Sequence, residues 1–301
     1  MNTQTPMPNR PPHASLRRWL AAAVNAVTAV MALTLVGCAT TTTEGGVPIN
    51  VSKTAKGQDS RSLFLVLHYT VADFPNSMKI LTEQQVSAHY LLSDGPQPKI
   101  YRLVDENRRA WHSGASAWIE NRRLNSSSIG IEIVHPGIKR GTPDGPAQFR
   151  QYEPFSQQQI DVLIPLVKDI VQRHGILPER ILGHGEVSAQ NKEDPGPTFP
   201  WKQLADLGIT PPWPDAGRAA ARRDIYAGEA GLPDPAWFQQ ALAQHGYEIR
   251  PTGVWDLQTQ RVLMNFQMRY RPANYLGLAD AETAAILWVL TNPMKPAPDG
   301  G

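Results

Sequence analysis

The sequence has almost no cysteine and no excess of one charge. One Cys in 301 residues excludes an intramolecular disulfide, a cysteine zinc knuckle and an iron–sulfur cage, so any metal site has to use His and carboxylate ligands. Lys plus Arg number 29 and Asp plus Glu 27, which excludes the strongly basic surface of a nucleic-acid-binding protein. The hydrophobic content of 41% is too high for a disordered acidic chain. A chain of this length predicts two folded domains.

A long apolar run occurs near the N-terminus, at 19–36, after two arginines, and its end overlaps Leu-Val-Gly-Cys at 35–38. This is the layout of a secretory signal, and a run of about 18 residues with internal polar residues lies near the lower limit for the alternative, a transmembrane anchor. The run ending at Cys38 resembles a bacterial lipobox, in which the Cys becomes the lipid-modified first residue. We expect a signal peptide at 1–37, a polar tether without a fold at 38–59, and attachment to a membrane through lipid on Cys38. Ala39 resembles the sorting signal for the outer membrane, facing the periplasm.

Hydrophobic runs between turn signals predict a sheet with helices. We expect strands at 62–68, 87–92, 100–104 and 129–134, and helices at 76–87 and 156–174. The short segment 181–184 leads into a loop rich in Pro and Gly. Period-2 alternation places Ile129, Ile131 and Ile133 on one face of their strand and Glu132 on the other. Ser156 is suited to cap the second helix and Gly175 to end it.

The C-terminal part repeats one turn pattern, Gly-x-x-Asp-x-x-Thr, at 253–259 and 277–283. In each copy the Asp is suited to cap the next helix. We therefore predict a linker at 211–230, a small helical domain at 231–292 and a tail at 293–301.

Three residues are candidate metal ligands: His68 at a strand end, and His184 and Asp194 on either side of a loop. Their spacing has no local signature, and a buried histidine at a strand end is more often a hydrogen-bonded core residue. The position of Glu132 favours a metal site, because a carboxylate in a central strand is costly to bury unless it is paired or takes part in the chemistry of a site. The alternative is a structural Glu held by an Arg or by backbone donors. Lys192 could stabilise an oxyanion, but most lysines are simply solvated.

Five ordered blocks carry a family resemblance: LVLHYTVADF, VSAHYLL, AWHSGAS, LNSSSIGIEIV and ILGHGEVSAQNKEDPGPTFPW. Together they resemble the zinc-dependent N-acetylmuramoyl-L-alanine amidases of the AmpD/AmiD type (amidase type 2), over roughly residues 60 to 205. The resemblance implies an α/β fold in which a central mixed β-sheet is flanked by helices, within a catalytic domain at 60–210. The segment 231–292 resembles the type 1 peptidoglycan-binding domain, a three-helix bundle.

The resemblance also implies a set of roles. His68, His184 and Asp194 would hold Zn²⁺, Glu132 would be the general base, and Lys192 would stabilise the oxyanion. The reaction would be hydrolysis of the amide between N-acetylmuramic acid and L-alanine in peptidoglycan or muropeptides, without an organic cofactor and without a nucleic-acid partner. Two other functions stay open: a peptidoglycan receptor that does not cut, and a zinc peptidase that acts on stem peptides.

Four further residues in or beside these blocks receive expected roles. Tyr90 and His112 are expected to bind substrate: Tyr90 would lie near the metal on the site face of its strand, and His112 would line the substrate groove. His89 is expected to be structural, and His135, which follows the strand, is expected to lie at the rim of the site.

Overall fold

The structure is a computed structural model that describes Met1 and residues 40–142, 150–228 and 230–294. The expected signal peptide and Cys38 lie outside these residues and stay predictions. The chain divides into two compact units, residues 1–58 and 59–301. Among the described helices, none is long and apolar enough to cross a membrane.

The first unit contains a β-hairpin. Strands β1 (Thr40–Thr42) and β2 (Pro48–Asn50) pair antiparallel, and Gly46 in the turn between them has a φ of 79°, which glycine adopts without steric cost. The segment expected at 38–59 as a tether without a fold therefore has local structure. The β-branched threonines favour it, although a hairpin of two strands is only marginally stable by itself.

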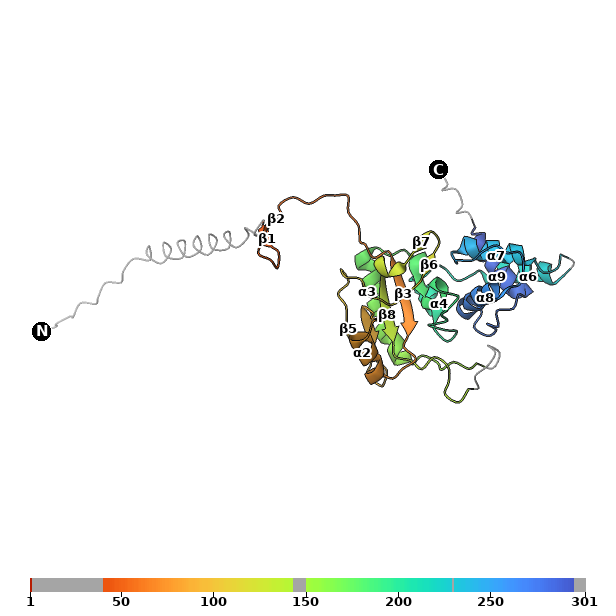
Figure 1. The fold of residues 1–301 in the computed structure, drawn as a ribbon, viewed down its shortest axis with the longest axis horizontal. Coiled ribbons are helices and arrows are strands. Elements are labelled where there is room, and N and C mark those ends of the chain that lie inside the picture. The colour runs from red at the N-terminus through yellow and green to blue at the C-terminus, as the bar shows by residue number, and fades with distance from the viewer. Residues whose placement is uncertain (2–39, 143–149, 229, 295–301) are drawn as a thin grey trace. The chain divides into compact units, whose positions relative to one another are not determined.

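The second unit is built on a mixed sheet (Figure 1). Within the described part of the chain this sheet has five strands in the order β5-β4-β8-β3-β9, of which β5 alone is antiparallel to its neighbour. The strands are β3 (Phe64–Tyr69), β4 (Tyr90–Leu92), β5 (Ile100–Arg102), β8 (Ser128–Ile133) and β9 (Ile181–Gly183). Four of them overlap the strands expected from the sequence, and β9 was not expected as a strand. The central mixed β-sheet is confirmed.

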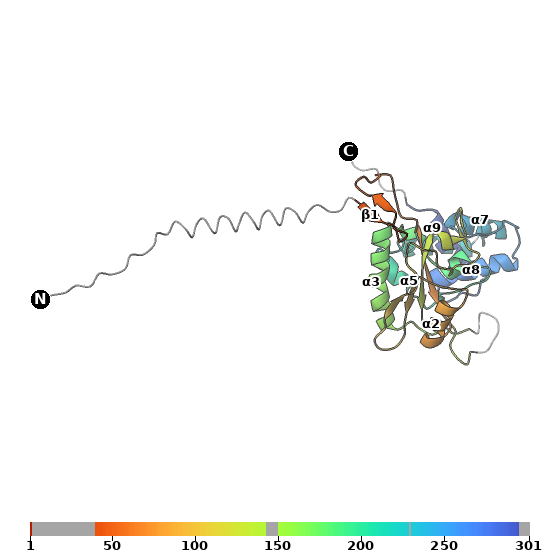
Figure 2. The ribbon, with the colours of Figure 1, turned by 60° about the vertical axis from the view of Figure 1, so that its left-hand side comes forward.

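Helix α3 (Gln157–His174) covers one face of this sheet, as Figure 2 shows. Ser156 caps it by accepting a hydrogen bond from the Gln159 N–H, and Gly175 ends it with a φ of 64°, as predicted. The apolar residues buried at this face come from β3, β8 and α3: Leu65, Leu67, Ile129, Ile131, Ile133, Leu163, Val167 and Ile170. The isoleucines thus share the core face, and Glu132 lies on the other.

The opposite face packs against the C-terminal helices α7 (Pro235–His245), α8 (Leu257–Tyr270) and α9 (Ala281–Thr291). One buried cluster joins the sheet and these helices: Phe64, Val66, Leu182, Phe238, Leu263, Phe266 and Leu287. Because the sheet and the helices share this core, the C-terminal helices form part of the same compact unit.

The repeated turns of the C-terminal part are two copies of one cap. Asp256 begins α8 and Asp280 begins α9, each by accepting from the N–H of the Thr three residues later, as predicted. A buried glutamine of the preceding helix, Gln239 or Gln267, accepts from the N–H of the turn's Gly and donates to the hydroxyl of its Thr. The repeat therefore encodes helix initiation.

The segment 211–230, expected as a linker, contains helix α6 (Ala216–Ala227). The proposed domain borders stay predictions. The remaining elements are α2 (Phe74–Glu83), β6 (Ala117–Trp118), β7 (Asn121–Arg122), η1 (Leu124–Ser126), η3 (Pro178–Arg180), α4 (His184–Val187) and α5 (Trp201–Asp206).

Candidate metal centre

Three neighbouring strands carry polar side chains to one edge of the sheet. His68 near the end of β3 is in register with Glu132 near the end of β8, and His184 follows β9 directly as the first residue of α4. The carboxyl ends of parallel strands meet at the same edge, which is where ligands bind in α/β sheets. Alternation turns His68 to the face opposite α3.

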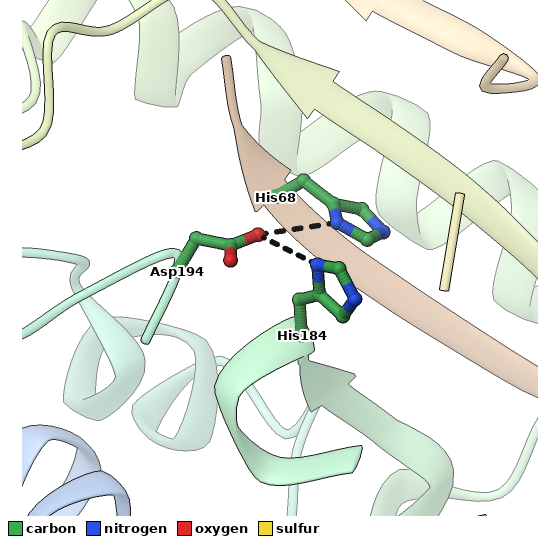
Figure 3. Close-up of side chains that lie close together, drawn as sticks. All are labelled: His68, His184 and Asp194. Carbon is green, nitrogen blue, oxygen red and sulfur yellow. Dashed lines mark hydrogen bonds and ion pairs between the residues drawn. The ribbon is translucent and has the colours of Figure 1, made fainter. Parts of the chain in front are cut away.

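The structure brings together the three predicted ligands (Figure 3). Oδ2 of Asp194 lies 3.1 Å from Nδ1 of His68 and 3.2 Å from Nδ1 of His184. All three residues are buried, and their ligand atoms lie within 4.8 Å of one another. Two N or O ligands that share a tetrahedral zinc ion at about 2.0–2.1 Å are about 3.3 Å apart. The cluster therefore fits a metal ion in size and donor type.

Burial and mutual contact set the protonation of this cluster. Burial, followed by the neighbouring His184, lowers the pKa of His68 to about 4. Burial by itself would raise the pKa of Asp194, but the contacts with His184 and His68 hold that pKa far below its ordinary value. His68 is thus a neutral imidazole and Asp194 a carboxylate, which are the forms that bind metals.

Glu132 lies beside the cluster with an oxygen that has no protein partner. Its Oε1 is 4.0 Å from Nδ1 of His68, and the side chain is 14% exposed. Its Oε2 is buried and accepts no hydrogen bond among the described residues. Burial, followed by the charge of Asp194, raises the pKa of Glu132 to about 8. Because an unsatisfied carboxylate oxygen is costly, this one is suited to a water or a substrate; no Arg or backbone donor satisfies Oε2 in the described chain.

A cleft of about 610 Å³ opens over the cluster. Lys192 is exposed on its wall, and its charge lowers the pKa of both Glu132 and His68. Other wall residues come from α2 and α8 and from the loops: Ile80, Leu81, Trp111, Arg150, Gln190, Arg261 and Met264. Lys192 therefore lies at the cleft, and its expected role towards an oxyanion stays a prediction.

His112 lies behind His68 and also lines the cleft. Its Nδ1 is 3.0 Å from Nε2 of His68, and its Nε2 is 3.1 Å from Oγ of Ser128. The ring covers Gly130, where a Cβ would come within 2.4 Å of it. The contact seen in the structure thus orients a candidate ligand; the expected contact with substrate stays a prediction.

Tyr90 is not at the cleft, which corrects the expectation. It pairs with Ile131, packs in the core on the α3 face, and donates a hydrogen bond of 2.6 Å from its hydroxyl to Glu106. Its neighbour His89 instead accepts from the Gly130 N–H through Nδ1. The alternation of β4 therefore turns Tyr90 away from the metal ligands, and His89 has the structural role that we expected.

The sequence analysis missed the contribution of helix α8 to this site. Arg261 and Met264 line the cleft, and Asn265 bonds to the loop before Asp194. Asn265 is a polar residue between the apolar Met264 and Phe266 and is 3% exposed, but the sequence around it does not indicate which segment it contacts.

Comparison with protein families gives two matches. Residues 58–197 match the N-acetylmuramoyl-L-alanine amidase family, and residues 232–287 match a peptidoglycan binding domain. The chain is 41% identical over 279 residues to the N-acetylmuramoyl-L-alanine amidase AmiD of Escherichia coli (strain K12), covering 89% of this chain and 94% of that protein.

Solved structures show the same similarity. The complex of AmiD from E. coli with the substrate anhydro-N-acetylmuramic acid-L-Ala-D-gamma-Glu-L-Lys is 40% identical with a TM-score of 0.70, over 83% of this chain and 96% of that one. AmpDh3 from Pseudomonas aeruginosa in complex with anhydromuramic pentapeptide is 36% identical with a TM-score of 0.71, over 81% and 96% of the two chains. With this coverage, the likeness includes the C-terminal helices.

Proposed function

The chain belongs to the N-acetylmuramoyl-L-alanine amidases of the AmiD type, and we propose that it hydrolyses the amide between the lactyl group of N-acetylmuramic acid and L-alanine. One observation carries the proposal: His68, His184 and Asp194 converge beneath a cleft, beside Oε2 of Glu132, which has no partner among the described residues. Peptidoglycan or a muropeptide is the substrate we infer, since relatives of the same fold are solved with anhydromuramic peptides.

Zinc is the metal that this donor set favours. Two imidazoles and one carboxylate are a common ligand set of catalytic zinc sites, which leave a fourth position open. When bound, zinc supplies a Lewis acid that polarises a carbonyl and lowers the pKa of water towards neutrality. His112, bonded to Nε2 of His68, fixes the direction in which Nδ1 of that ligand points.

Proton transfer is the role we assign to Glu132. Its Oε2, which has no partner in the described chain, accepts the proton of the attacking water and then delivers it to the departing nitrogen of L-alanine. The ammonium of Lys192 offsets the negative charge that forms on the scissile carbonyl oxygen.

The cleft is lined by two kinds of side chain. Ile80 and Leu81 of α2 and Trp111 are apolar, and Lys192 and Arg261 are cations. A sugar ring packs on the first kind of surface, and the carboxylates of a stem peptide suit the second.

The location of the protein is a further part of the proposal. Lipid on Cys38 would attach the folded units to the outer membrane on its periplasmic side. The support is the apolar run at 19–36 and its Leu-Val-Gly-Cys ending.

Incubation of the protein with a defined muropeptide, followed by mass spectrometry of the products, tests the reaction. We expect one sugar product and one peptide that begins with L-alanine, and none of either from His184→Ala. An intact substrate that co-elutes with the protein would instead indicate a receptor, and a cut within the stem peptide would indicate a zinc peptidase.

A further inference from the structure

Helix α8 bonds to the chain segment that carries two of the candidate metal ligands. Its residues Arg261, Asn265 and Arg269 are spaced four apart and therefore lie on one side of the helix. Each of the three donates hydrogen bonds to the segment 181–194, which includes His184 and Asp194.

Asn265 makes the central contact. Its Nδ2 donates to the carbonyl of Lys192 at 3.1 Å and to that of Ala189 at 3.4 Å, and the side chain is buried. The same side chain approaches Gly185, where a Cβ would lie 2.0 Å from Oδ1 of Asn265. Only glycine after His184 lets the helix approach this closely.

The two arginines fix the segment on either side of this contact. Nη1 of Arg261 donates to the carbonyl of Gln190 at 2.8 Å. Nη1 of Arg269 donates to Oε2 of Glu186 at 2.7 Å and to the carbonyl of Ile181 at 3.2 Å, and both members of this ion pair are 5% exposed. The segment is therefore bonded to α8 at several points between the end of β9 and Lys192.

We propose that Asn265 is a positioning residue for the metal centre. It holds the segment between His184 and Asp194 so that both ligands are set for the metal and Lys192 faces the cleft. The proposal rests on the proposed function in taking these two residues as ligands. It makes helix α8 a part of the catalytic apparatus, in addition to any contact that the C-terminal helices make with peptidoglycan.

The test compares Asn265→Ala with Gln260→Ala, an exposed position on the same helix. Three quantities are measured. Zinc affinity is obtained by competition with a chromogenic chelator, and kcat and KM are obtained with a muropeptide as substrate. Hydrogen exchange of residues 185–192 is followed in the metal-free protein. In Asn265→Ala we expect zinc to bind about 10- to 100-fold more weakly, kcat to fall with little change in KM, and exchange of the segment to quicken. Gln260→Ala should match the wild type in all three.

Gly185→Ala tests the same contact by changing the residue that Asn265 approaches, and it leaves α8 unchanged. It replaces Asn265→Ala in the test if that variant does not fold. The added methyl clashes with Asn265, so zinc binding should weaken. Combining it with Asn265→Ala removes the clash with the Asn265 side chain and leaves a tight contact of 3.0 Å with Cα of Glu193. The two losses should therefore be less than additive, as expected for residues in contact.

The outcomes separate the two proposals. If the wild type binds zinc and cleaves the muropeptide while Asn265→Ala equals it in zinc affinity, kcat and exchange, the positioning role is wrong. Additive losses in the double variant also contradict the contact. If the wild type itself binds no zinc or cleaves nothing, the proposed function fails, and the exchange of the metal-free variants still reports on the contact between α8 and the segment.

Discussion

Replacing Glu132 by Gln changes one oxygen of the carboxylate beside the metal ligands into an amide nitrogen. The side chain keeps its length and its place 4.0 Å from Nδ1 of His68. Since Oε2 accepts no hydrogen bond from the described residues, the substitution breaks none there. It removes only the ability to accept a proton.

The expected magnitude follows from this. A positioned general base contributes a factor of about 10² to 10⁴ in rate, which is roughly 2.7 to 5.4 kcal/mol at about 1.36 kcal/mol per factor of ten. We expect kcat of Glu132→Gln to fall by that factor. Burial raises the pKa of Glu132 to about 8, so the metal-free site favours an uncharged group, and the amide should change the free energy of unfolding by less than about 1 kcal/mol.

Three measurements decide the role of Glu132: steady-state kinetics on a muropeptide, zinc content, and the melting temperature. Glu83→Gln, at an exposed position of α2, is the matched control and should leave all three unchanged. A Glu132→Gln protein that keeps more than about a tenth of the wild-type kcat refutes base catalysis by this residue. A large fall in melting temperature with kcat retained would make it a structural residue.

Three further predictions address other parts of the chain. Cys38→Ser should move the full-length protein from the membrane to the soluble fraction of cells, and a full-length variant that stays on the membrane contradicts the lipid anchor. The bond from Arg173 is the largest cause that lowers the pKa of Glu106 to about 2, from 4.5. A lowered carboxyl pKa gives stability that is present above about pH 4.5 and is lost as the pH falls towards 2. The melting temperature of the wild type should therefore fall more steeply over this range than that of Glu106→Gln, and equal slopes argue against the ion pair. Arg269→Met leaves Glu186 buried without its partner and should lower the free energy of unfolding by about 3–5 kcal/mol in urea melts, so a loss below about 1 kcal/mol would contradict the buried pair.

Local pattern predicts the sheet and α3 well but does not identify the metal centre. Each predicted strand overlaps an observed one because a short apolar run bounded by turn residues is typical of a buried strand. His68, His184 and Asp194 are far apart in the chain, and nothing in their spacing shows that parallel strands bring them to one edge. Only the family resemblance selected them as ligands.

Tyr90 shows a second limit of sequence analysis. Its side of the sheet depends on register, and a shift of one residue moves a side chain to the opposite face. The short strand β4 has too few residues to fix that register by pattern. A family block that includes a tyrosine does not by itself say which way the side chain points.

The role of α8 could not be predicted, because it depends on tertiary packing alone. A helix with buried residues on one side predicts a core, but not which element covers it. The shared core of the sheet and the C-terminal helices brings Asn265 to the loop before Asp194, and no local signal in either segment indicates that meeting.

Titration of the metal-free protein with zinc, followed by the rate of muropeptide cleavage at the muramoyl–alanine amide, tests the account most directly. We predict no cleavage without metal, a rise in rate up to one equivalent of zinc per chain, and no response in His184→Ala. His135→Ala, outside the ligand cluster, should respond as the wild type does. Full cleavage by the metal-free protein would contradict the assignment of His68, His184 and Asp194 as the ligands of a catalytic metal.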